Sequence, residues 1–334
     1  MRNDLTGTPT PSDEVARPTS RQAALSGLNR LRDFGIPIAV LIVFAYLSFA
    51  SPVFFTGRNL LNVLDQSAIV GIIAAAGTLV LIGGCLDLSS GAIFAISGVI
   101  AGMMVPYLGV PAALAVGALS GTVFGLLNGV ISTAGRVNSI ITTLATGIMI
   151  RGFALVITGG ALVRVTNPTF SSLGGADYAG VTTAVFVFLA MVAITWFLLA
   201  RTTFGRYIFA VGGNPEAAKL SGVSVNQIRT ATFVISGLAA AIAGVLSASR
   251  VSTGQADAGI GLEINAIAAI LIGGTSIAGG EGAVWRTGFG ILLVTLIGNG
   301  FNLLDFNPIW QQVFQGAVIL GAVALDSWSR SKDV

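Results

Sequence analysis

The chain has 334 residues, of which 54% are hydrophobic and only 9% are charged, with a formal net charge of +3. Soluble domains carry about 25% charged residues, so this composition excludes an ordinary soluble protein and indicates an integral membrane protein. The sequence has no histidine and a single cysteine, Cys85. It therefore excludes histidine-based acid–base chemistry and an internal disulfide, and we expect no metal site.

Residues 1–33 are polar, rich in Pro, Ser and Thr, and carry five arginines. This composition predicts a disordered N-terminal tail. It does not fit a cleavable signal peptide, because the first apolar run starts too late and lacks a small-residue cleavage site. At the other end, residues 328–334 predict a short C-terminal tail.

Between the tails, residues 34–327 predict a transmembrane domain. About 20 apolar residues cross a ~30 Å hydrocarbon core, and runs of that length predict an all-α integral membrane fold with about ten transmembrane helices. Their ranges are 34–51, 60–83, 90–108, 111–134, 138–158, 181–200, 229–250, 262–278, 286–304 and 309–327. The breaks at 84–91 and 273–282 are either loops or re-entrant segments, which a membrane tolerates only where protein or a water-filled cavity satisfies the backbone.

The distribution of Lys and Arg predicts the orientation of these spans. With ten spans and an inside N-terminus, thirteen Lys and Arg residues lie inside and three lie outside, namely Arg58, Arg164 and Arg250. This asymmetry satisfies the positive-inside rule. Both tails and the polar segment 201–229 are therefore expected in the cytoplasm.

Four glycines recur at every fourth residue of the fourth predicted span. Gly117, Gly121, Gly125 and Gly129 form one smooth stripe along that helix. Small residues let helices approach closely in lipid, so such repeats mark helix–helix contacts. The stripe indicates packing within the chain or, as the alternative, an interface with another subunit.

Polar side chains recur inside the apolar spans, where they are costly. Amides and hydroxyls suit an uncharged, polyhydroxylated solute, although each taken singly fits a helix–helix hydrogen bond better. The candidates for a translocation path are Asn62, Gln66, Asn128, Asn138, Thr142, Thr143, Arg151, Asn299, Asn302 and Gln312. The arginine among them must snorkel, pair or face water. We expect Asp87 to cap the third span and Glu263 to begin the eighth, and the scarcity of other buried acids argues against proton coupling.

The polar segment 201–229 carries the signature of a short, capped helix. Asn214 suits the N-cap, and Pro215 suits the first helical position. An acid in the first turn and a lysine near the end suit the helix dipole, and Gly222 can adopt the left-handed conformation that ends a helix. Ser224, with Gln227 three residues later, predicts a capping box that opens the next span.

So much local specification favours a docking helix for a soluble partner over a solvated connector. The candidate docking residues are Asn214, Pro215, Glu216, Ala217, Ala218, Lys219, Leu220, Ser221 and Gly222. The chain has no G-x-x-x-x-G-K-[ST] nucleotide loop. If ATP drives transport, another chain must therefore bind it, and we expect this chain to be a transport subunit without enzymatic activity of its own.

Six segments, taken together and in order, resemble the permease subunits of the ribose/monosaccharide family of ABC importers. The resemblance covers about residues 34–327. The segments are Asn59–Leu64; Gly83–Gly91; Thr143–Gly147 with Arg151–Gly152; Phe204–Asn214 with Ala217–Gly222; Glu263–Ala269 with Gly273–Gly280; and Asn299–Leu304.

The resemblance implies a ten-helix permease in a bacterial cell membrane, working as a homodimer or with a related permease. The helix at 214–222 would dock into a cytoplasmic ABC ATPase, which binds ATP and magnesium. An extracytoplasmic sugar-binding protein would deliver a monosaccharide or similar solute. The resemblance implies no cofactor in this chain and no nucleic-acid partner, and membrane lipid surrounds the fold.

The chain departs from this family's pattern at several positions. Asn138 and Ser139 stand where a Pro-Phe pair is common, Cys85 replaces an aliphatic residue, and Asp65 replaces a basic or polar one. These changes affect either substrate choice or helix packing. The alternative functions are a secondary, ion-coupled transporter or channel for a small polar solute, and a structural membrane scaffold.

Overall fold

The computed structural model describes the backbone of residues 20–307 and the side chains from residue 35 onward. It also describes residues 310–311, 313–314, 316–317, 320–321 and 324. The predicted span at 309–327 therefore lies largely outside the described residues, as do most of the N-terminal tail and the C-terminal tail.

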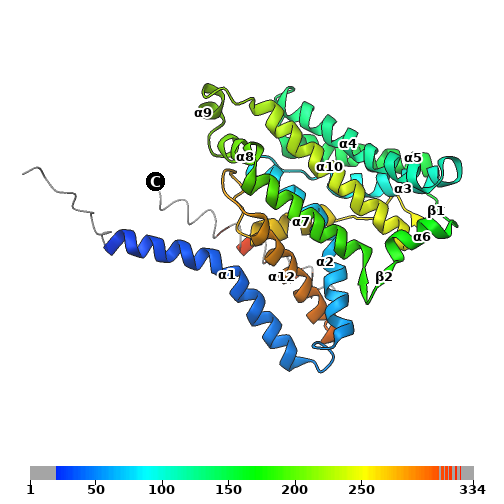
Figure 1. The fold of residues 1–334 in the computed structure, drawn as a ribbon, viewed down its shortest axis with the longest axis horizontal. Helices are drawn as coiled ribbons and strands as arrows, with labels where there is room; N and C mark the ends of the chain where they lie inside the picture. The colour runs from blue at the N-terminus through cyan, green and yellow to red at the C-terminus, as the bar shows by residue number, and fades with distance from the viewer. Residues whose placement is uncertain are drawn as a thin grey trace, which may run out of the picture.

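Helices dominate the described residues (Figure 1). Seven of them are long and apolar enough to cross a membrane. These are α2 (Gly57–Ile82), α3 (Ser90–Leu108), α4 (Val110–Thr133), α5 (Ser139–Thr158), α7 (Thr183–Arg201), α10 (Val225–Arg250) and α12 (Val284–Leu303). Each corresponds to a predicted span to within a few residues. The all-α membrane fold class is confirmed.

The first and eighth predicted spans differ from the prediction. α1 (Ser20–Ala50) contains the first span but begins within the predicted tail, where Arg, Gln, Ala and Leu are good helix formers. α11 (Leu262–Ile272) has 11 residues and ends before 278. It rises only about 16 Å, which is too short for a ~30 Å hydrocarbon core, because Gly273 and the left-handed Gly274 (φ 74°) end it.

Short elements connect the spans at the two ends of the molecule. α8 (Thr203–Gly213) and α9 (Pro215–Leu220) follow α7 and define what we call the α9 end. At the opposite end lie α6 (Pro168–Gly175) and two small antiparallel pairs. β1 (Val163–Arg164) pairs with β4 (Thr253–Gly254), and β2 (Asp177–Tyr178) pairs with β3 (Val181–Thr182).

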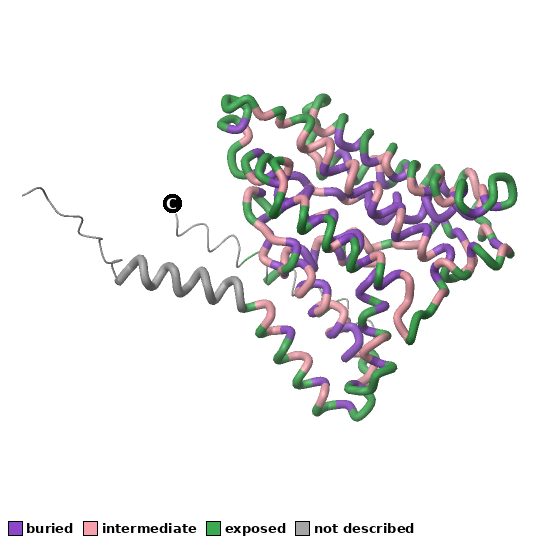
Figure 2. The backbone as a smooth tube through the Cα atoms, viewed as in Figure 1, coloured by how far each residue is buried: buried purple, intermediate pink, exposed green. Residues whose placement is uncertain are grey.

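The core of the bundle is formed by α2, α3 and α10 (Figure 2). In their most apolar stretches 78%, 67% and 61% of residues are buried, against 28% or less in α4, α5 and α7. The last three helices therefore form the rim, whose outer apolar side chains are exposed in the single chain, as expected for surfaces that face lipid or another subunit.

The glycine stripe of α4 lies against α10 and α3. All four glycines are buried. A Cβ atom on Gly125 would overlap the carbonyl oxygen of Phe233, and one on Gly129 would lie 2.8 Å from the Cα of Thr230. The stripe thus lets α4 approach the α10 backbone within one chain, which leaves no room there for a second subunit.

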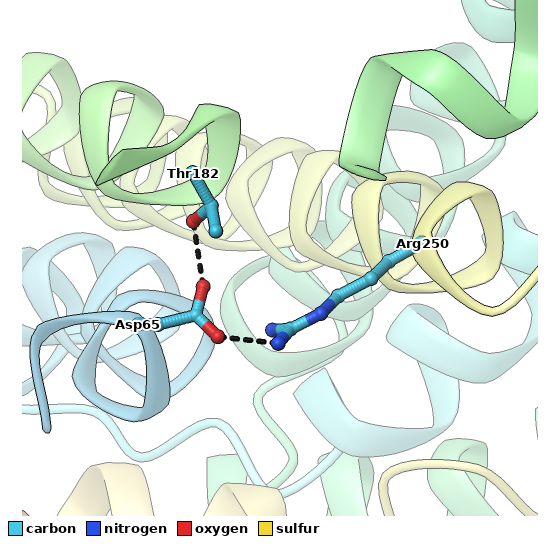
Figure 3. Close-up of polar contacts among 3 residues, drawn as sticks. All are labelled: Asp65, Thr182 and Arg250. Atoms are coloured by element: carbon cyan, nitrogen blue, oxygen red, sulfur yellow. Dashed lines mark hydrogen bonds and ion pairs between the residues drawn. The ribbon is translucent and has the colours of Figure 1, made fainter. Parts of the chain in front are cut away.

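An ion pair closes the opposite end of the bundle (Figure 3). Asp65, in the third turn of α2, is 8% exposed. One of its carboxylate oxygens lies 2.5 Å from an Arg250 nitrogen at the end of α10. The other accepts a hydrogen bond of 2.6 Å from the Thr182 hydroxyl, just before α7. Asp65, one of the departures from the family pattern, therefore ties three spans together.

We predict that Gly125→Ala lowers the free energy of unfolding by about 1–3 kcal/mol, because overpacking forces the backbones apart. The matched control is Gly152→Ala on α5, where an added Cβ meets open space and alanine improves helix propensity. Thermal unfolding in detergent measures both. Equal losses in the two variants would contradict the close α4–α10 packing.

We also predict that Asp65→Asn destabilises the protein by about 1–2 kcal/mol, because the Arg250 guanidinium loses its charged partner. Asp257→Asn is the control, since Asp257 is exposed. A double-mutant cycle with Arg250→Gln isolates the pair. Strictly additive effects in that cycle would show that the ion pair does not hold these helices.

Candidate functional site

The α9 segment is a helix with hydrogen-bonded caps at both ends. The Asn214 side chain accepts a hydrogen bond of 3.0 Å from the Ala217 N–H, and Pro215 occupies the first turn. At the other end Gly222 has φ 83°. The Gly222 and Val223 N–H groups donate to the carbonyls of Lys219 and Ala218, at 3.0 Å each, which is the Schellman pattern. The caps make α9 a defined shape in spite of its short length.

The side chains of α9 point mostly away from the protein. Ala218 is its one buried residue, whereas Glu216 and Lys219 are exposed. Leu220 is 89% exposed, among the most exposed of the large apolar side chains. α9 therefore exposes an apolar side chain next to two charged side chains.

α8 anchors this segment to the bundle. Its buried residues are Gly205, Ile208, Val211 and Gly212. The helix begins at Thr202, whose hydroxyl accepts a hydrogen bond from the Gly205 N–H at 3.2 Å. α8 packs against α2 and α10, so α9 is linked to the core by noncovalent contacts as well as by the chain.

The predicted capping box at the start of α10 is wrong. Ser224 is the N-cap residue, and the helix starts at Val225, close to the predicted position. However, the Ser224 side chain makes no capping hydrogen bond. The backbone carbonyl of Ser224 accepts from the Ile228 N–H at 3.1 Å, and this helical bond begins α10 without help from the side chain.

Three of the translocation-path candidates are buried, and their side chains make hydrogen bonds that connect two segments of the chain. Asn299 of α12 and Asn59 of α2 exchange side-chain bonds of 2.9 and 3.2 Å. Asn128 of α4 donates to the Ser89 hydroxyl at 2.7 Å. Thr143 of α5 accepts from the Leu88 N–H at 3.0 Å. In this conformation these three side chains hold the fold together.

The other candidates do not converge on one site. Asn62, Gln66 and Asn302 are exposed, and Asn138 is an exposed N-cap of α5. The Thr142 hydroxyl is buried without a hydrogen-bond partner. Gln312 lies outside the described residues.

Arg151, the one charged candidate, pairs with backbone carbonyls. Its guanidinium donates to the Ala256 and Ala258 oxygens at 3.2 and 3.1 Å. The arginine thus ties α5 to the connection between α10 and α11, and its charge is spread over two peptide dipoles.

The break before α3 is an extended, largely buried segment. Residues 85–89 have no regular secondary structure. Two of their N–H groups bond to α5, since Leu86 donates to the Ser139 hydroxyl at 3.2 Å and Leu88 donates to Thr143. The protein therefore satisfies this irregular backbone, as a segment within a membrane requires.

The expectation that Asp87 caps α3 is wrong, because the N-cap position belongs to Ser89 and no side chain caps the helix. The N-cap residue is Ser89, whose N–H and hydroxyl donate to one Asp87 oxygen at 2.9 and 2.6 Å. The other oxygen accepts from the Ser236 hydroxyl of α10 at 2.7 Å. Asp87 therefore holds the start of α3 against α10, a contact for which the sequence carries no local signal.

A small cavity lies beside this carboxylate. Its volume is about 20 Å³, and Asp87, Ser90, Ser236 and Glu263 contribute polar atoms to its lining. Glu263 lies in the first turn of α11, as expected, and one of its oxygens is buried without a hydrogen-bond partner. The space is large enough for about one water molecule and far too small for a sugar. No group of three potential metal ligands comes together among the described residues.

Comparisons with known proteins cover most of the chain. The ribose import permease protein RbsC of Haemophilus influenzae is 37% identical over 304 residues, covering 88% of this chain and 93% of the relative. RbsC of Escherichia coli K12 is 38% identical over 299 residues, covering 87% and 92%. The L-arabinose ABC transporter permease protein AraH of Azospirillum brasilense is 34% identical over 325 residues, covering 97% and 95%.

No solved structure matches the chain. The model of one protein family, described as branched-chain amino acid transport system / permease component, matches residues 59–323. This match runs from α2 past α12 and includes α9 and both breaks. The chain therefore belongs to this family of transport-system permease components.

Proposed function

We propose that this chain is the membrane permease subunit of an ATP-driven importer for a monosaccharide or a similar small polyhydroxylated solute. The observation that carries the proposal is the family match over 59–323, supported by relatives named as ribose and arabinose permeases. The chain has no nucleotide-binding loop, so a separate ABC ATPase binds ATP and magnesium.

In this proposal the α9 end faces the cytoplasm, and α9 docks into the ATPase. The opposite end, with its β pairs and α6, faces an extracytoplasmic binding protein that delivers the solute. A second permease copy or a related permease completes the path within a bacterial cell membrane. ATP binding moves the ATPases, and α9 passes this movement through the chain to α7 and α10.

The test of the proposed function is uptake by vesicles that contain this chain, its ATPase and its binding protein. We expect labelled pentoses or related monosaccharides to enter only when ATP and both partners are present. Uptake driven by an ion gradient without the ATPase would contradict the proposal and favour a secondary transporter. The absence of uptake of any small polar solute under either condition would favour a structural role.

The role of α9 is tested by Leu220→Asp, which replaces its exposed apolar side chain with a charge. We predict that ATPase binding and uptake both fall at least about tenfold, because a buried contact with the partner is worth more than 1.4 kcal/mol. Pull-down of the ATPase and vesicle uptake measure the effect. Leu220→Met is the matched control and should retain both activities, whereas full ATPase binding by Leu220→Asp would rule out α9 as the docking element.

A further inference from the structure

Three backbone segments that are distant in sequence meet behind α9 without intervening side chains. They are the end of α2 with residues 83–84, the end of α8 at Gly212, and Gly279–Gly280 in the break after α11. The Gly280 N–H donates to the Ile82 carbonyl oxygen at 2.8 Å. We call this meeting point the glycine junction and define it by Ile82, Gly83, Gly84, Gly212, Gly279 and Gly280.

The glycine junction has no space for side chains. A Cβ atom on the buried Gly212 would overlap the Ile82 carbonyl oxygen. A Cβ on Gly279 would lie 2.7 Å from the Gly84 Cα, and Gly279 has φ 86°, which strains other residues. These contacts are between backbones, so no rotamer change can absorb a displacement of one segment against another.

α10 joins the junction through an arginine. The Arg229 Nε donates to the Gly83 carbonyl oxygen at 3.0 Å. Arg229 lies in the second turn of α10, shortly after α9. The chain on both sides of α9 therefore contacts the end of α2, through Gly212 before it and Arg229 after it.

The junction leads directly into both breaks of the membrane domain. Residues 83–89 continue from it to the Asp87 network and α3, and residues 279–283 continue to α12. A movement of α8 has to displace the Ile82 carbonyl or the Gly280 N–H, because each is already in contact. The chain links α9 directly to α8 and α10, and the junction adds a contact between α8 and the segments that lead to α3 and α12.

We propose that the glycine junction transmits the movement of α9 to the two breaks and thereby couples ATP hydrolysis to opening of the path. This proposal rests on the proposed function. It predicts that filling the junction separates hydrolysis from uptake without preventing assembly with the ATPase.

The experiment compares Gly212→Ala with Gly213→Ala at the end of the same helix. Gly213 is exposed, and an added Cβ there meets nothing within 4 Å. The readout is solute taken up per ATP hydrolysed by the complex in vesicles. We expect this ratio to fall at least about fivefold in Gly212→Ala, in the range of a lost allosteric coupling, and to stay within about twofold of the unchanged protein in Gly213→Ala, because no coupling contact is altered there.

A second variant, Arg229→Gln, adds no atoms to the junction and removes the Arg229 bond to Gly83. Arg229→Gln should also lower the amount of solute taken up per ATP hydrolysed. If Gly212→Ala does not insert into the membrane, the result for Arg229→Gln alone tests the proposal. An unchanged ratio in every variant that inserts would overturn the proposal. If the unchanged protein shows no ATP-dependent uptake, the proposed function fails instead, so the two failures are distinguishable.

Discussion

Where the chain is not helical inside a membrane, its backbone N–H and C=O groups need hydrogen-bond partners from the protein itself. This requirement governs much of the structure. The extended segment 85–89 meets it with hydroxyls from the start of α5, Ser139 and Thr143. The break after α11 meets it in part through the Gly280 bond to the end of α2. The irregular segments are thus built into the core and are fixed by contacts from α2 and α5.

This requirement also explains why polar side chains inside the spans are a poor guide to a solute path. Asn128 and Thr143 suit a sugar as well as any amide or hydroxyl, but in this chain they bind Ser89 and the backbone of the break. Asn299 is paired with Asn59 across two helices. A side chain that already hydrogen-bonds a neighbouring segment cannot bind a solute unless the two segments separate. A path therefore has to form between elements that move.

Local signals in the sequence are enough to predict α9, but they do not predict which distant segments pack around it. Asn214, Pro215 and Gly222 determine that helix through bonds within a few residues, and such bonds have a fixed spacing. The length of α11, the Asp87 bond to Ser236 and the meeting of Gly212 with Ile82 depend on segments far apart in the chain. The spacing of residues carries no information about those contacts. The sequence therefore indicates the two glycine-rich breaks but not that they touch each other.

The distribution of tight contacts determines which parts of the bundle can move together. α2 and α10 are tied at the α9 end by Arg229 and Gly83 and at the opposite end by Arg250 and Asp65. The glycine stripe fixes α4 to α10 along its length. These helices form one stiff unit, because close backbone packing cannot slide without losing contact. α5 packs against α3 and contributes Ile150 and Ala154 to the core, and its Thr143 and Arg151 bond to extended segments. The break at 85–89 therefore joins this stiff unit to α5, because it continues from the end of α2 and bonds to Ser139 and Thr143 of α5.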